Sequence, residues 1–148
     1  MRVSETYRFD LDLSEHDASV VTDRLVAYNQ THGPTTSPPP EGARPLRVAV
    51  RSGDGELGGG LIGRTHAIPF WLEISVLWVD EAARQHGLGR RLMERAEREA
   101  RLRGCRFVRL ATSDYQAPDF YRKLGYIQYG RLEDCPPGET AYYLRKAL

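Results

Sequence analysis

The spacing of hydrophobic and polar residues divides the first third of the chain into a strand, a helix and a loop. Residues 7–13 alternate apolar with polar side chains, which predicts a strand. Ser14 is a suitable N-cap for the next segment, where apolar residues recur at helical spacing as far as Gly33, a residue type that ends helices. Residues 33–45 hold five prolines and are expected to form a loop within one domain.

The rest of the chain alternates between strands and helices. Its patterns predict strands over residues 46–51, 60–68, 71–79, 105–112, 126–131 and 140–145, and helices over residues 84–103 and 117–124. The apolar side of the longer helix is expected to comprise Leu88, Leu92, Met93, Ala96, Ala100 and Leu102. This order predicts a single α/β (α+β) domain over residues 1–148, with a central mixed sheet flanked by helices.

Composition and charge argue against several classes of protein. A chain of 148 residues has the size of one domain, and 21 basic against 20 acidic residues give a net charge of +1, whereas a dedicated nucleic-acid binder carries a basic excess. The longest apolar stretch, residues 74–79, is far shorter than a membrane span, and the charged N-terminus is unlike a signal peptide. We therefore expect a cytoplasmic protein without nucleic-acid or membrane partners. Cys105 and Cys135 lack metal-ligand spacing and are expected to be structural thiols.

Two glycines mark a candidate anion site where an apolar strand leads into the longer helix. Gly87 and Gly89 remove side chains at the helix start, where backbone N–H groups lack intrahelical partners and the helix dipole favours negative charge. Nearby arginines add positive charge, so the arrangement indicates phosphate binding. The alternative is an arginine-rich surface helix whose glycines serve only the turn.

A second glycine-rich segment, residues 58–63, matches the GxGxxG pattern of dinucleotide-binding proteins. The residues after it include Pro69 and have the pattern of a strand, so no helix N-terminus follows to receive a pyrophosphate. We therefore expect these glycines to permit a bulge or close packing instead.

Glu73 is the only charged residue in the predicted strand 71–79. Strict alternation would place it on one face with Ser75, Leu77 and Val79. A carboxylate on a mostly buried strand must be paired, hydrated or shifted in pKa, so Glu73 is a candidate general base. An ion pair or a hydrated strand end is the alternative.

Tyr121 is the third candidate for chemistry. In the predicted helix 117–124, Phe120 and Leu124 share one face and are expected to join the core. Tyr121 lies at the edge of that face, so its hydroxyl can point into a cleft, although simple amphipathic packing is the alternative.

Together these segments resemble the GNAT superfamily of acyl-CoA N-acyltransferases. Residues 84–89, Arg-Gln-His-Gly-Leu-Gly, fit that family's pyrophosphate loop, Q/R-x-x-G-x-G/A. Residues 117–126 are similar to its A-x-x-F-Y-x-K-L-G-F segment. The order of the other predicted elements fits as well, except that the proline-rich loop 33–45 occupies the place of the family's second helix.

The resemblance implies an N-acetyltransferase that moves an acetyl group from acetyl-CoA to a primary amine by direct attack in a ternary complex, without a metal. Tyr121 would be the general acid, and Glu73 remains the candidate base. The donor would be held by backbone groups of the strand and by the loop, that is, by Leu77, Trp78, Val79, Arg84, Gln85, His86, Gly87, Leu88, Gly89 and Arg90. Asp114 stands where the family often has a CoA-binding Asn, and it completes the candidate donor site.

Two questions stay open at the level of sequence. The acceptor could be a small-molecule amine, an antibiotic amine, a peptide N-terminus or a protein lysine, and a homodimer could form through the strand that contains Tyr142 and Tyr143. The alternative function is a non-catalytic acyl-CoA-binding or protein-interaction module with the same fold.

Overall fold

The computed structural model describes residues 8–33, 42–67 and 70–148. It divides into two units, residues 1–37 and residues 38–148. Its elements are α1 (Glu15–His32), β1 (Arg44–Arg51), β2 (Leu57–His66), β3 (Trp71–Val79), η1 (Glu81–Ala83), α2 (Leu88–Leu102), β4 (Phe107–Ser113), η2 (Asp114–Gln116), α3 (Pro118–Lys123), β5 (Ile127–Glu133) and β6 (Thr140–Ala147). The prediction of a single domain stays a prediction.

The first unit confirms the predicted helix and contradicts the predicted strand. The Ser14 hydroxyl accepts a hydrogen bond from the Asp17 N–H at 3.0 Å, and Gly33 ends the helix, as expected. Residues 8–13 form no strand. The alternating pattern fixes only where side chains point, and a strand also needs a hydrogen-bonded neighbour, which these residues lack among the described strands. Tyr7 and residues 34–41 of the expected loop lie outside the described residues.

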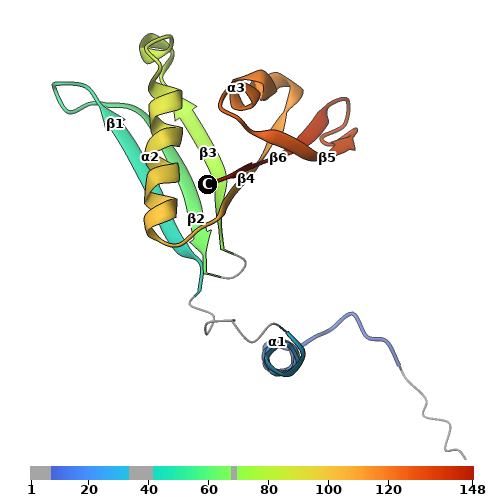
Figure 1. Cartoon of the computed structure of the whole chain (residues 1–148). Coiled ribbons are helices and arrows are strands. Elements are labelled where there is room, and N and C mark those ends of the chain that lie inside the picture. The colour runs from blue at the N-terminus through green and yellow to red at the C-terminus, as the bar shows by residue number, and fades with distance from the viewer. Residues whose placement is uncertain (1–7, 34–41, 68–69) are drawn as a thin grey trace, which may run out of the picture. The chain divides into compact units, whose positions relative to one another are not determined.

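The second unit is built on a six-stranded mixed sheet in the order β1-β2-β3-β4-β6-β5 (Figure 1). All neighbouring strands are antiparallel except β3 and β4, which are parallel and are connected through α2. The predicted class, a central mixed sheet with flanking helices, is confirmed. Most boundaries differ from the prediction by one to three residues, although Ile68 lies outside the described residues.

Helix α2 packs across β1, β2 and β3 and supplies much of the core (Figure 1). Four of its predicted apolar residues are buried, namely Leu92, Met93, Ala96 and Ala100. Leu102, however, is 79% exposed, so its predicted place in the core is wrong. Two residues after Ala100 it lies about 200° around the helix, on the side away from the sheet. No helix in the described part of the chain combines the length and hydropathy required to cross a membrane.

The glycines of β2 let two strands approach closely, as predicted. A Cβ atom on Gly63 would lie only 2.6 Å from the Glu73 carbonyl oxygen. At this point the ladder shifts, because Gly63 pairs with Ile74 whereas Ile62 pairs with Val76. Ser75 is therefore an extra residue in β3, and the strands form a bulge there.

The bulge overturns the predicted arrangement of side chains along β3. Glu73 pairs with Arg64, whereas Leu77 pairs with Leu61, and positions 61 and 64 of β2 point to opposite faces. Glu73 therefore lies on the face opposite Leu77 and Val79, because the extra residue reverses the alternation between them. The two apolar side chains turn toward the core, against which they pack.

Candidate active site

The central feature of the site is a gap between two neighbouring strands of the sheet. β3 and β4 pair through residues 71–74 and 107–110 only, and beyond Ile74 the two strands separate. Within the described residues, the β4-facing edge of β3 after Ile74 has no strand partner. Its backbone donors and acceptors can therefore bind an extended ligand as if it were another strand.

A cavity of about 460 Å³ adjoins this open edge. It is lined by the end of β3, the loop before α2, and residues at the start of α3: Leu77, Trp78, Val79, Arg84, Gln85, Gly87, Leu88, Gly89, Arg90, Gln116, Ala117, Phe120 and Tyr121. The structure thus gathers Tyr121 and the candidate donor residues around one cavity, apart from His86 and Asp114. The loop and the strand that the family resemblance assigns to one donor line the same cavity.

The loop before α2 has the backbone geometry of an anion-binding turn. Gln85 and Gly87 adopt left-handed conformations, with φ of 70° and 69°. Successive turns of this kind point several N–H groups into one concavity. Helix α2 begins at Leu88, four residues later than predicted, and the first helical N–H bond runs from Arg91 to the Gly87 carbonyl at 3.1 Å. The N–H groups at the helix start are therefore available to a ligand.

Gly89 has a steric role that its spacing alone does not reveal. A Cβ atom at this position would lie 3.2 Å from the Phe120 ring and 3.8 Å from a Val79 methyl group. The missing side chain lets the start of α2 lie directly against the start of α3. This contact places the loop and the tyrosine-bearing helix on the same cavity.

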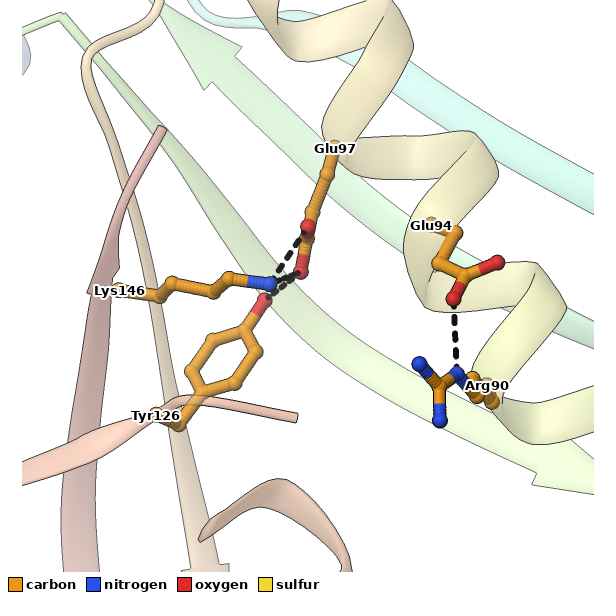
Figure 2. A network of polar contacts seen from close by, with 5 residues as sticks. All are labelled: Arg90, Glu94, Glu97, Tyr126 and Lys146. Atoms are coloured by element: carbon orange, nitrogen blue, oxygen red, sulfur yellow. Dashed lines mark hydrogen bonds and ion pairs between the residues drawn. The ribbon is translucent and has the colours of Figure 1, made fainter. Parts of the chain in front are cut away.

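Two arginines add positive charge at the loop, and each has a partner. The Nε of Arg84 donates to the Val79 carbonyl at 3.1 Å, which fixes the loop to the end of β3. The Nε of Arg90 donates to Glu94 Oε1 at 2.8 Å (Figure 2). Both guanidinium groups are exposed, so they contribute a screened field rather than a buried charge.

Tyr121 is half-buried and lies between aromatic neighbours, as expected for the edge of a helix face. Its ring meets those of Phe120 and Tyr126 edge-on, with centroid distances of 5.1 Å and 6.0 Å. Burial raises the pKa of the Tyr121 hydroxyl above its ordinary value, so the group is protonated at neutral pH. Tyr121 also lines a second cavity, of about 380 Å³, which lies in the gap between β3 and β4.

Glu73 lies near the gap but not in either cavity that Tyr121 lines. Its Oε2 accepts a hydrogen bond from Arg109 Nη2 at 2.7 Å, and His66 Nε2 is 3.7 Å away. The structure thus contains the ion pair that the sequence left open, while the role of Glu73 as a base stays a prediction. Glu73 lines a third cavity, of about 310 Å³, which shares four lining residues with the second: Ile74, Ser75, Leu110 and Ala111.

The partner of Glu73 could be identified only once the order of the strands was known. Arg109 is the only charge in β4, as Glu73 is in β3. Two isolated opposite charges on adjacent buried strands are expected to pair. Recognising this required the strand order, which places β3 beside β4 in register at these two residues.

Asp114 is occupied by contacts within the protein. Its Oδ1 accepts from the Tyr142 hydroxyl at 2.7 Å, and its Oδ2 accepts from the Thr140 N–H at 3.1 Å. The hydrogen bond from the Tyr142 hydroxyl to Asp114 raises the pKa of Tyr142. The carboxylate fastens η2 to the start of β6, and it does not line the cavity of about 460 Å³. Gln116, which the sequence interpretation missed, lines that cavity.

The chain resembles known acetyltransferases in both sequence and structure. The sequence profile of the acetyltransferase (GNAT) family matches residues 19–126, a range that includes the loop and Tyr121. Blasticidin-S acetyltransferase of Streptomyces morookaense is 46% identical over 110 residues, which cover 72% of this chain and 79% of that protein. An acetyltransferase of Agrobacterium fabrum is 32% identical over 136 residues, 91% of this chain and 94% of its own length. A solved acetyltransferase from Bacillus cereus, 28% identical, has a TM-score of 0.78 and covers 95% of this chain and 98% of its own.

Proposed function

Because the chain belongs to the GNAT family of acetyltransferases, we propose that it transfers the acetyl group of acetyl-CoA to a primary amine of a small molecule. The observation that carries this proposal is the single cavity that unites the open edge of β3, the loop of residues 84–90 and Tyr121. The transfer is direct within a ternary complex, so no nucleophile of the enzyme is required.

The donor is bound by backbone groups more than by side chains. The pyrophosphate lies at the N–H groups of residues 85–90, where the left-handed turns and the dipole of α2 favour an anion. The pantetheine arm runs along the unpaired edge of Leu77, Trp78 and Val79 and forms strand-like hydrogen bonds there. The thioester then enters the gap between β3 and β4, beside Tyr121.

The acceptor amine must lose a proton before it attacks the thioester. A free alkylamine has a pKa of roughly 10, so most of it is protonated at pH 7. Glu73 acts as the base through one water, and the amine attacks from the cavity that Glu73, Tyr129 and Tyr143 line. The hydrogen bond from Arg109 holds the Glu73 carboxylate in one orientation.

Tyr121 acts on the leaving group. As the new C–N bond forms and the C–S bond breaks, negative charge develops on the CoA sulfur, and the Tyr121 hydroxyl donates a hydrogen bond to it. The raised pKa makes Tyr121 a weak acid that retains its proton until sulfur carries that charge. The thiolate then takes the proton from Tyr121, and the proton held by Glu73 restores Tyr121 through water. The nitrogen of the new amide loses its second proton to solvent, so the reaction releases one proton overall.

For the acceptor, we place an antibiotic amine first, with blasticidin S as the compound to test. The support is the 46% identical relative, whose name gives that substrate. Peptide N-termini and protein lysines are the competing acceptors.

The decisive experiment is the measurement of thiol release from acetyl-CoA with a panel of acceptors. The panel contains blasticidin S, an aminoglycoside, a polyamine, amino acids and a short peptide. We expect release with one acceptor class, and in Tyr121→Phe we expect kcat to fall by roughly 10² or more while acetyl-CoA binding is retained. Tyr115→Phe is the matched control, because Tyr115 is 65% exposed and does not line the cavity. Acetyl-CoA binding without thiol release from any acceptor would favour the non-catalytic module.

A further inference from the structure

Glu97, Tyr126 and Lys146 form a polar network in the interior of the fold (Figure 2). The Tyr126 hydroxyl donates to Glu97 Oε1 at 2.9 Å. Lys146 Nζ contacts both oxygens of the same carboxylate, at 3.1 Å and 2.9 Å. The three side chains come from α2, from the residue before β5, and from β6, so one carboxylate joins three separate parts of the fold.

The network is unusual in its burial. The Glu97 side chain is only 5% exposed and that of Lys146 25%, while Tyr126 as a whole is 2% exposed. Burial, followed by the charge of Glu97, raises the pKa of Tyr126 far above its ordinary value, so this hydroxyl remains a donor. A buried carboxylate with three hydrogen bonds has little freedom to move.

Tyr126, which the network holds in place, contacts Tyr121 in two ways. Its backbone N–H donates to the Tyr121 carbonyl at 3.1 Å, and its ring meets the Tyr121 ring edge-on at 6.0 Å. Helix α3, which bears Tyr121, has only six residues and cannot fix a side chain by its own hydrogen bonds. The ring of Tyr121 therefore also depends on Tyr126, a contact from outside its own helix.

We infer that Tyr126, anchored by Glu97 and Lys146, is a positioning residue for Tyr121. This inference rests on the proposed function, because it assumes that Tyr121 acts on the leaving sulfur. Glu97 lies two turns along α2 from the loop that would hold the donor. Its carboxylate therefore fixes the position of Tyr121, the proposed acid, relative to the helix that begins at this loop. None of the three network residues lines the donor cavity, that is, the cavity of about 460 Å³ in which acetyl-CoA would bind. Their effect on catalysis therefore passes through Tyr121 alone.

The test is a double-mutant cycle of Tyr126→Phe and Tyr121→Phe. Tyr126→Phe keeps the ring contact and loses only the bond to Glu97. We expect kcat to fall roughly tenfold with KM for acetyl-CoA unchanged, because small misplacements of a reacting group have effects of this size. In the Tyr121→Phe background the same substitution should change kcat less than twofold, since the positioned hydroxyl is already gone.

Two further variants keep the test decisive. Glu97→Leu removes the acceptor of the Tyr126 hydroxyl and should reproduce the loss of kcat, again only when Tyr121 is present. Leu46→Ala, at a core residue of β1 that is 2% exposed, controls for lower stability and should leave kcat unchanged well below its melting temperature.

The possible outcomes separate the two hypotheses. Equal losses of kcat in both backgrounds, or no loss in Tyr126→Phe, would overturn the positioning role while leaving the acid role of Tyr121 intact. An unchanged kcat in Tyr121→Phe alone would overturn the acid role, and the positioning role with it.

Discussion

Replacing Gly87 with alanine provides a direct test of the anion-binding loop. Gly87 has φ of 69°, and nothing lies within 4 Å of an added Cβ atom, so the substitution introduces conformational strain without a clash. A left-handed conformation costs an L-residue about 1–2 kcal/mol, which the loop can relieve only by turning its N–H groups away from their present directions. A hydrogen bond to a charged group contributes about 1.5–3 kcal/mol, so losing one should raise KM for acetyl-CoA by about tenfold or more.

Gly104→Ala is the matched control at the other end of the same helix. Gly104 has φ of 84° and equally open surroundings, but it lies far from the donor cavity. Both variants should lose about 1–2 kcal/mol of unfolding free energy, measured in urea, whereas only Gly87→Ala should raise KM in the thiol-release assay. Equal KM values for the two variants would refute the assignment of the loop to the donor.

Three other substitutions test separate parts of the structure. Gly63→Ala should lower the free energy of unfolding by about 3 kcal/mol or more, because its Cβ would lie 2.6 Å from the Glu73 carbonyl oxygen. Gly53→Ala is the control, because the surroundings of Gly53 are open and no such loss is expected. Equal urea midpoints for the two variants would contradict the close approach of the strands. Glu73→Gln should reduce kcat/KM most near pH 7 and regain activity toward pH ~10, where the amine loses its proton unaided; a parallel loss at every pH would exclude the base. Above pH ~10 the folded state keeps a proton on Tyr126 that the unfolded chain releases, so the native protein loses stability as the pH rises. Tyr126→Phe should therefore make the free energy of unfolding depend less on pH in this range. Identical slopes of unfolding free energy against pH for the two proteins, measured in denaturant titrations, would contradict the raised pKa of Tyr126.

The sequence predicted those features of the fold that are determined by interactions between residues close together in the chain. The caps at Ser14 and Gly33 fixed α1, and the apolar run 71–79 gave β3 with its observed bounds. The spacing of Gly87 and Gly89 pointed to the loop at the start of α2, although two left-handed residues delay the helix itself to Leu88. In each case the physical cause lies within a few residues of the feature.

Features that depend on distant partners could not be predicted in this way. The bulge at Ser75 exists because β2 and β3 shift register, and strict alternation therefore put Glu73 on the wrong face. Glu97 is a charged residue in a helix rich in charges, and its burial follows only from the approach of Tyr126 and Lys146. Asp114 likewise finds its partners across the sheet, in β6.

The short ladder between β3 and β4 has a mechanical consequence. Strands β1–β3 with α2 form one half of the sheet, β4–β6 with α3 form the other, and only four residue pairs join the halves edge to edge. Such a short ladder resists separation of the two strands, but it allows one half of the sheet to rotate relative to the other. The carboxylate of Glu97 is a second point of attachment, set off from the ladder, because α2 belongs to one half and Lys146 to the other. The packing of Gly89 against Phe120 is a third attachment, so the separation of the two halves is fixed at several points and does not depend on the carboxylate alone.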